Sequence, residues 1–274
     1  LLKLKKLINY YIFRILILLE LYPRISYHFE CDQRRIDQLK NSFFFKLQNS
    51  FRMLKISYYE RIIRINSKYY SEIINKNYKI TNEYIVVCDT PMSHPDITVL
   101  DGRKDKDLIE DYYYKLHNFL KCIENTFRKK VILCLHPKGE YENYDNFKLL
   151  KKDFKTTMYE TSYYITKALF VLFQTSNTIN DAIILNKPII QINSELLSGI
   201  TKKKLLDFNK QLNCPMINIE ELNKINSELY DKIKKKTKNY IKYRENRLIF
   251  EKKKKDLDQL TYYINTQILA WKLL

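Results

Sequence analysis

Residues 170–193 constrain the fold more than any other stretch of the chain. The segment FVLFQTSNTINDAIILNKPIIQIN reads as an apolar strand, a turn rich in hydroxyl groups, a short helix and a second apolar strand opened by Lys187 and Pro188. Strands that alternate with helices form a parallel sheet with right-handed crossovers. The continuous apolar runs are typical of strands that are covered on both faces. This stretch therefore predicts an α/β fold.

Other segments repeat the same alternation along the chain. Further strands are predicted at 84–89, 131–135 and 216–219, and an amphipathic helix is predicted at 106–129. Shorter helices are predicted at 146–152, 161–168 and 202–212. We expect a Rossmann-like parallel sheet flanked by helices, with helical N- and C-terminal segments. The predicted divisions are 1–80, mainly helical; 81–225, the Rossmann-like domain; and 226–274, basic C-terminal helices.

The net charge of +18 is concentrated toward the C-terminus. Residues 231–255 hold twelve Lys and Arg residues against three acids, Asp231, Glu245 and Glu251. Such a run is the solvated face of a terminal helix or a contact with an anionic membrane surface. Nucleic acid is a less favoured partner, because no recognisable nucleic-acid-binding module accompanies the charge.

Neither a membrane span nor a bound cofactor is predicted. Leu7 to Leu19 is apolar, but the run is short and Arg14 interrupts it, whereas about 20 apolar residues are needed to cross a bilayer. The five cysteines show no metal-binding spacing and fit a reducing cytoplasm. The chain has no GxGxxG, P-loop, HExxH or GxSxG motif, so we expect no cofactor and no metal. The expected location is cytoplasmic, either free or peripheral on the inner face of the cytoplasmic membrane.

Two polar turns follow predicted strands and suit a phosphate or another anion. The first turn holds Thr175, Ser176, Asn177 and Thr178, and the second holds His136, Pro137 and Lys138 followed by Gly139. Turns at the carboxyl ends of parallel strands lie where ligands bind. The first turn also opens a helix, whose N-terminal N–H groups attract anions. Imidazole donates hydrogen bonds, and lysine supplies a point charge.

Structural roles for the same residues stay open. In that alternative the hydroxyl groups only cap the helix, with Thr178 and Asp181 as a box-like pair, and His136 only packs. A third turn, after residue 88, contains Asp89, His94 and Asp96. A carboxylate and an imidazole there suit acid–base catalysis, so Asp89 and His94 are the candidate catalytic residues, although both types also shape loops.

Three segments together resemble bacterial capsule and surface-polysaccharide biosynthesis proteins with a GT-B-like glycosyltransferase architecture. They are YIVVCDTPMSHPDI, VILCLHPKGEYENYDNF and FQTSNTINDAIILNKPII. A His-Pro pair that ends a strand, followed by a Ser/Thr turn and a helix, is similar to the donor-binding half of bacterial sialyltransferases. The resemblance implies that the donor's phosphate contacts His136, Pro137 and Ser176, with Thr175 and Thr178 beside them. It also implies that residues 1–80 are a truncated acceptor domain. The chain departs from the family in one respect, because the acidic motif that supplies the catalytic base is not found.

The resemblance implies a metal-independent glycosyltransferase. Such an enzyme moves a sugar from a nucleotide-sugar donor to a glycan or glycolipid acceptor during capsule or lipopolysaccharide assembly. Two alternatives remain. One is a nucleotide-sugar epimerase or hydrolase on the same architecture, and the other is a non-enzymatic basic module that binds a membrane or nucleic acid.

Overall fold

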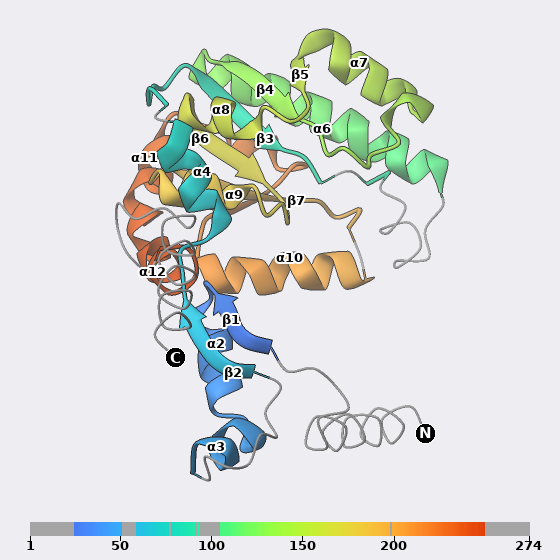
Figure 1. Cartoon of the computed structure of the whole chain (residues 1–274). Helices are drawn as coiled ribbons and strands as arrows, with labels where there is room; N and C mark the ends of the chain where they lie inside the picture. Colours follow the sequence, from blue (N-terminus) through green and yellow to red (C-terminus); the bar gives the residue numbers. More distant parts are fainter. Residues whose placement is uncertain are drawn as a thin grey trace. The chain divides into compact units, whose positions relative to one another are not determined.

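The computed structural model describes residues 25–50, 59–76, 78–90, 92–93, 105–197 and 199–249 (Figure 1). The chain divides into two compact units. One comprises residues 75–244 and contains the large sheet, and the other comprises residues 1–74 with 245–274.

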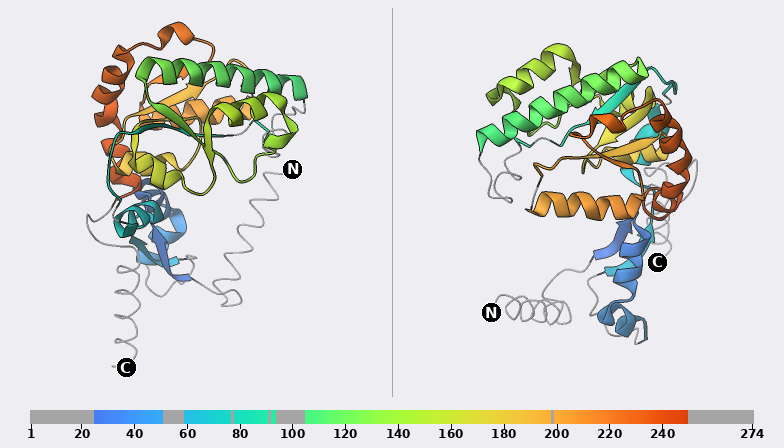
Figure 2. Two further views of the ribbon diagram at one scale, coloured as in Figure 1. Left: turned by 90° about the horizontal axis from the view of Figure 1, so that it is seen from above. Right: turned by 180° about the vertical axis from the view of Figure 1, so that it is seen from behind.

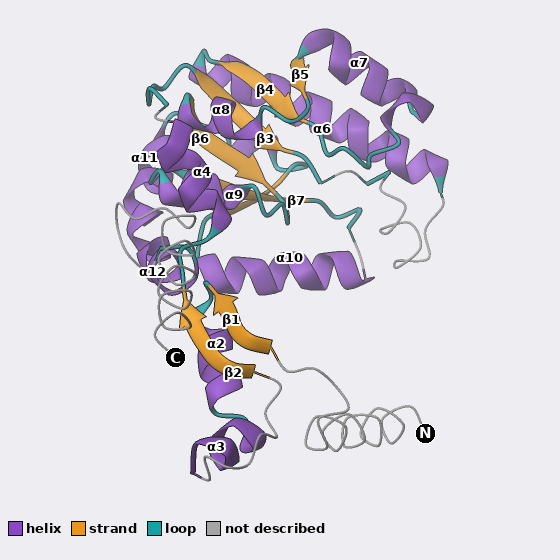
Figure 3. Ribbon diagram, in the orientation of Figure 1, coloured by secondary structure: helices purple, strands orange, loops and turns teal. Residues whose placement is uncertain are grey.

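The unit of residues 75–244 is built on a six-stranded parallel sheet (Figure 3). Its strands are β3 Tyr84–Cys88, β4 Lys130–Cys134, β5 Lys155–Thr157, β6 Ala168–Phe173, β7 Ile189–Asn193 and β8 Met216–Asn218. Their order across the sheet is β5-β4-β3-β6-β7-β8. The chain winds outward from β3 in one direction and then restarts at β6 in the other. This is the doubly wound Rossmann order, whose ligand-binding crevice lies where the winding reverses. The expected Rossmann-like α/β fold is confirmed.

Helices cover both faces of this sheet (Figures 1 and 2). They are α6 Lys106–Phe127, α7 Asp145–Asp153, α8 Thr161–Thr166, α9 Ile179–Ile184, α10 Gly199–Leu212, α11 Glu228–Lys235 and α12 Ile241–Arg247, the last of which crosses the unit boundary. Successive strand residues point to opposite faces, so Ile85 and Val87 pack in the core beside α6, while Cys88 faces α8 and α9. Because both faces are covered, every residue from Ile85 to Asp89 is buried.

Helix α6 supplies much of the core on its face of the sheet. Its buried residues recur at helical spacing: Ile109, Tyr112, Tyr113, Leu116, Phe119, Leu120 and Ile123. Asp105 caps the helix by accepting a hydrogen bond from the Asp107 N–H at 3.0 Å. The helix ends where Arg128 adopts a left-handed conformation with φ 51°.

The other unit contains strands as well as helices. Strands β1 Ile25–Glu30 and β2 Tyr59–Arg64 pair in parallel, and helices α2 Gln33–Lys40, α3 Phe43–Ser50 and α4 Lys68–Lys76 belong to the same part of the chain. These two strands were not predicted from the sequence, whose residues 1–80 were expected to be mainly helical. Two contacts join the two chain segments of this unit. Arg247 pairs with Asp32 at 3.4 Å, and the Leu248 carbonyl accepts a hydrogen bond from the Ser67 N–H at 2.9 Å.

Among the described residues, no helix combines the length and apolar character that crossing a bilayer requires. The apolar run from Leu7 to Leu19 lies outside the described residues.

Candidate functional site

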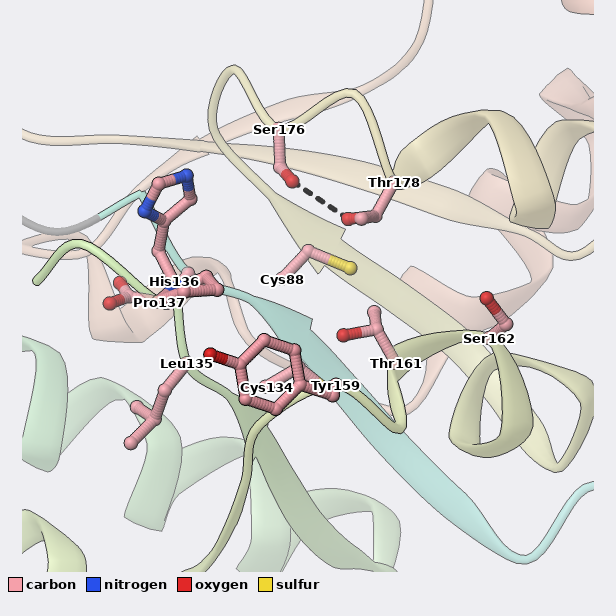
Figure 4. A pocket seen from close by; sticks show the side chains of 11 residues that line it. Cys88, Cys134, Leu135, His136, Pro137, Tyr159, Thr161, Ser162, Ser176 and Thr178 are labelled. Carbon is pink, nitrogen blue, oxygen red and sulfur yellow. Dashed lines mark hydrogen bonds between the residues drawn. The ribbon is translucent and has the colours of Figure 1, made fainter. Parts of the chain in front are cut away.

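A cavity of about 200 Å³ lies at the carboxyl edge of the sheet, beyond the ends of β3, β4 and β6 (Figure 4). Its walls come from three turns and from the strand ends beneath them. The lining residues are Cys88, Asp89, Cys134, Leu135, His136, Pro137, Tyr159, Thr161, Ser162, Ser176 and Thr178. The cavity lies where the winding of the sheet reverses, the place at which doubly wound proteins bind ligands.

The His-Pro turn and the hydroxyl turn open onto this one cavity. His136 and Pro137 line it from the end of β4, and Ser176 and Thr178 line it from the turn after β6. Figure 4 shows the imidazole and the Ser176 hydroxyl extending to the same side of the strand ends. The two turns therefore face one shared cavity.

The remaining predicted residues do not all reach the cavity. Lys138 and Asn177 are exposed on the same two turns, and neither they nor Thr175 line the cavity. Asp89 lines it from the end of β3. His94 and Asp96 lie outside the described residues.

Asp89 is the only carboxylate among the lining residues, and it is held by Tyr141. The Tyr141 hydroxyl donates to Asp89 Oδ2 at 2.7 Å and accepts from the backbone N–H of His136 at 2.8 Å. The hydroxyl thus links the turn after β3 to the turn after β4. Asp89 is 6% exposed, and its burial raises the pKa of the carboxyl to about 6, although the hydrogen bonds from Tyr141 and Thr90 oppose this shift.

The backbone fixes the orientation of the His136 ring. The Lys138 N–H donates to His136 Nδ1 at 3.2 Å, so in the neutral ring the proton lies on Nε2. The turn itself closes through the Gly139 N–H, which donates to the His136 carbonyl at 3.1 Å. The imidazole therefore enters the cavity with a defined donor atom.

The hydroxyl turn differs from the sequence-based expectation. Helix α9 has six residues, and its first N–H groups, those of Ile179, Asn180 and Asp181, donate to the carbonyls of Ser176, Asn177 and Thr178. The expectation of outward-pointing N–H groups is wrong for these three residues, because the turn already uses them. The box-like pair is also wrong, since Thr178 makes no side-chain cap and Asp181 accepts from Ser162 Oγ at 2.6 Å.

The turn instead presents hydroxyl groups to the cavity. Ser176 Oγ and Thr178 Oγ1 are 2.7 Å apart and share a hydrogen bond. A hydroxyl can donate one hydrogen bond and accept others, so this pair can turn a donor toward an anion.

The third wall was not anticipated from the sequence. Tyr159 lies between β5 and α8, and Thr161 and Ser162 lie in the first turn of α8. The pairing of β4 with β5 brings this segment alongside the end of β4. Strand β5 is the polar segment KTT, so it gives no apolar strand signal. The hydroxyl-rich segment TTMYETS, from Thr156 to Ser162, is the local sign of a polar wall here.

Two cysteines lie under the cavity at paired positions of β3 and β4. Cys88 and Cys134 are register partners, and both thiols are free and buried. Burial raises the pKa of the Cys134 thiol to about 12 and that of Cys88 in the same direction. Both therefore stay protonated at neutral pH and are poor nucleophiles.

In the part of the chain that the structure describes, no three His, Cys, Asp or Glu side chains gather in a way that could hold a metal ion.

Comparisons with known proteins give a distant likeness to solved structures. No protein-family model matches the chain, and no curated protein matches it. Among solved structures, the chain is similar to the pneumococcal O-GlcNAc transferase GtfA in complex with UDP and GlcNAc. The identity is 12%, the match covers 90% of this chain and 44% of that chain, and the TM-score is 0.31. The chain thus spans less than half the length of that transferase, and a TM-score this low leaves function to be inferred from the cavity.

Proposed function

We propose that the chain is a glycosyltransferase that binds the phosphate of a nucleotide-sugar donor in the cavity at the ends of β3, β4 and β6. The observation that carries this proposal is the convergence of the His-Pro turn and the hydroxyl turn on one cavity. Its volume of about 200 Å³ is below the roughly 300–1,000 Å³ of whole small-molecule sites. It therefore suits the phosphate rather than the entire donor.

The proposed phosphate contacts are hydrogen-bond donors of defined position. His136 Nε2–H and the hydroxyls of Ser176 and Thr178 donate to the phosphate oxygens, while Pro137 shapes the turn. Lys138, on the exposed side of the same turn, adds positive charge without direct contact, and Thr175 and Asn177 complete the hydroxyl turn. Donors that are already positioned need not reorganise as charge develops on the leaving phosphate.

In the proposed reaction the acceptor's hydroxyl oxygen attacks the anomeric carbon of the donor sugar. The new glycosidic bond forms as the bond between that carbon and the phosphate oxygen breaks, and the bonding electrons leave with the nucleotide. Asp89 takes the proton of the attacking hydroxyl. Its raised pKa of about 6 suits a base that works near neutral pH. His94 remains a second candidate for this role from the sequence.

We extend the proposal to the acceptor and the location. The acceptor is a glycan or glycolipid of capsule or lipopolysaccharide assembly. The enzyme needs no metal ion, and it acts in the cytoplasm, attached peripherally to the inner face of the cytoplasmic membrane. The support for a surface contact is α11, where Leu229 and Ile233 are buried while Lys232, Lys234 and Lys235 are exposed. Flotation with anionic and neutral lipid vesicles tests this part, since the proposal requires association with the anionic vesicles alone.

The domain assignment also remains a proposal. Residues 81–225 are the donor-binding domain, and residues 1–80 are part of an acceptor domain. Residues 226–274 are the basic C-terminal segment, of which residues 250–274 lie outside the described residues. The parallel pair of β1 and β2 with its helices supports an α/β character for that last part.

The proposed contacts are tested by exchanging one side chain at a time. We expect His136→Ala and Ser176→Ala each to weaken binding of uridine or cytidine diphosphate by about tenfold, since each removes a hydrogen bond to a charged group. Matched controls are His117→Ala and Ser227→Ala, because neither residue lines the cavity. The His117 ring instead pairs with Asp153, at a distance of 2.9 Å. Unchanged affinity in both cavity variants would remove the proposal.

The same preparation separates transfer from other chemistry on this architecture. A nucleotide-sugar epimerase or hydrolase turns over its substrate without an acceptor, whereas the proposed transferase needs one. Turnover of nucleotide sugars in the absence of any acceptor, at the rate seen in its presence, would favour that alternative.

A further inference from the structure

Tyr159 has an unusual backbone conformation. Its φ is 71°, in the left-handed region that favours glycine. Among the described residues, the other non-glycine residues with positive φ are Arg128, Asn186 and Asn213, and each of them follows the end of a helix. A left-handed residue is common there. Tyr159 instead lies between β5 and α8.

The side chain of Tyr159 is as unusual as its backbone. It is 82% exposed, the highest value among the exposed large hydrophobic residues of the described chain, yet it lines the cavity. Figure 4 shows the ring near the strand ends that form the cavity. A residue that is both strained and exposed contributes little to folding, and such residues cluster at ligand clamps and active sites.

The turn that carries Tyr159 is held in place by its neighbours. Thr157 Oγ1 donates to Glu160 Oε2 at 2.9 Å, and β5 is fixed to β4 by the register of Thr157 against Cys134. The backbone of Tyr159 is therefore held at the rim of the cavity.

The volume of the cavity leaves most of a nucleotide sugar outside. A space of about 200 Å³ accommodates a phosphate, so the groups on either side of that phosphate must lie against the rim. The rim residue with a large exposed aromatic face is Tyr159. Aromatic faces stack on nucleobases, and this contact is tolerant of which base is present.

We propose that the Tyr159 ring is the stacking platform for the nucleobase of the donor. The inference rests on the proposed function, because it requires the donor's phosphate to occupy the cavity. Tyr159 then binds the base while His136 and Ser176 bind the phosphate. Its left-handed backbone directs the ring to the rim rather than into the core.

The test compares ligands with and without a base on the same variants. Isothermal titration is run with pyrophosphate, uridine diphosphate and glucose 1-phosphate on wild type, Tyr159→Ala, Tyr159→Phe and Tyr159→Gly. Tyr114→Ala is the matched control, since Tyr114 is a half-exposed tyrosine on α6 that does not line the cavity. Melting temperatures are measured on all five proteins.

We expect Tyr159→Ala and Tyr159→Gly to weaken uridine diphosphate binding by about tenfold or more, with pyrophosphate and glucose 1-phosphate unchanged. Tyr159→Phe keeps the affinity, because its ring is retained. Tyr159→Gly raises the melting temperature relative to Tyr159→Ala, because glycine adopts the left-handed conformation without strain.

Three outcomes overturn the inference and leave the proposed function standing. The first is an unchanged affinity of Tyr159→Ala for uridine diphosphate. The second is an equal loss of affinity for pyrophosphate. The third is a loss of affinity for glucose 1-phosphate alone, which would assign the ring to the sugar. If the wild-type protein binds neither pyrophosphate nor uridine diphosphate, the proposed function fails and the inference fails with it.

Discussion

Replacing Asp89 with asparagine should make the protein more stable at neutral pH while removing the proposed base. The carboxyl is 6% exposed, and its burial raises the pKa from 3.8 to about 6. Between these values the folded chain binds more protons than the unfolded chain, so the free energy of unfolding falls as pH rises. A shift of about two pKa units corresponds to about 3 kcal/mol of destabilisation once the group is fully ionised. Asparagine keeps the shape and can accept from Tyr141, but it carries no charge.

The assay is urea unfolding of wild type and Asp89→Asn across the pH range. Other carboxyl groups titrate in both proteins, so their contributions cancel in the difference. We expect the stability of Asp89→Asn relative to wild type to increase by about 2 kcal/mol between pH 4.5 and pH 7.5. Asp153→Asn is the opposite-sign control: hydrogen bonds from Lys121 and His117 lower the pKa of Asp153, so that variant loses stability relative to wild type as pH rises. A flat difference for Asp89→Asn would refute the claim that its carboxylate is desolvated.

Two further predictions concern the framework of the site. A Cβ on Gly139 would clash with the ring of Tyr141, so Gly139→Ala should displace the ring and destabilise the fold by about 1–3 kcal/mol. Urea unfolding should show that most of this cost disappears when Tyr141 is also replaced by leucine. Lys187 Nζ donates to the carbonyls of Thr81 and Ala168 at 2.6 and 2.7 Å, at the edge of the sheet opposite the cavity. Lys187→Met should therefore cost about 2–4 kcal/mol of stability. Titration of the folded variant should nevertheless give an unchanged affinity for uridine diphosphate. A tenfold loss of affinity would contradict a purely structural role for Lys187.

The central strands could be predicted because burial on both faces leaves a clear mark on their sequences. Segments such as YIVVC at β3 and ALFVLF at β6 are continuous apolar runs, and the structure places them within a residue or two of the predicted bounds. Strand β5, the polar triplet KTT, carries no such mark and was missed, because an edge strand of three residues is fixed by its pairing with β4.

The site could be predicted only as far as its turns follow strands. His136 comes directly after one apolar run, and Ser176 lies in the turn that follows another. Parallel topology brings such positions to one edge of the sheet. Tyr141 and Tyr159 could not be selected among 23 tyrosines, because their roles depend on tertiary contacts. One ring links two turns by hydrogen bonds, and the other is directed outward by a left-handed backbone.

The most direct measurement is a double-mutant cycle on pyrophosphate affinity with His136→Ala, Ser176→Ala and the double variant. If both side chains contact one anion, each single change weakens binding, and the loss in the double variant differs from the sum of the two free-energy losses. No loss of affinity in either single variant would show that the two turns do not share a ligand.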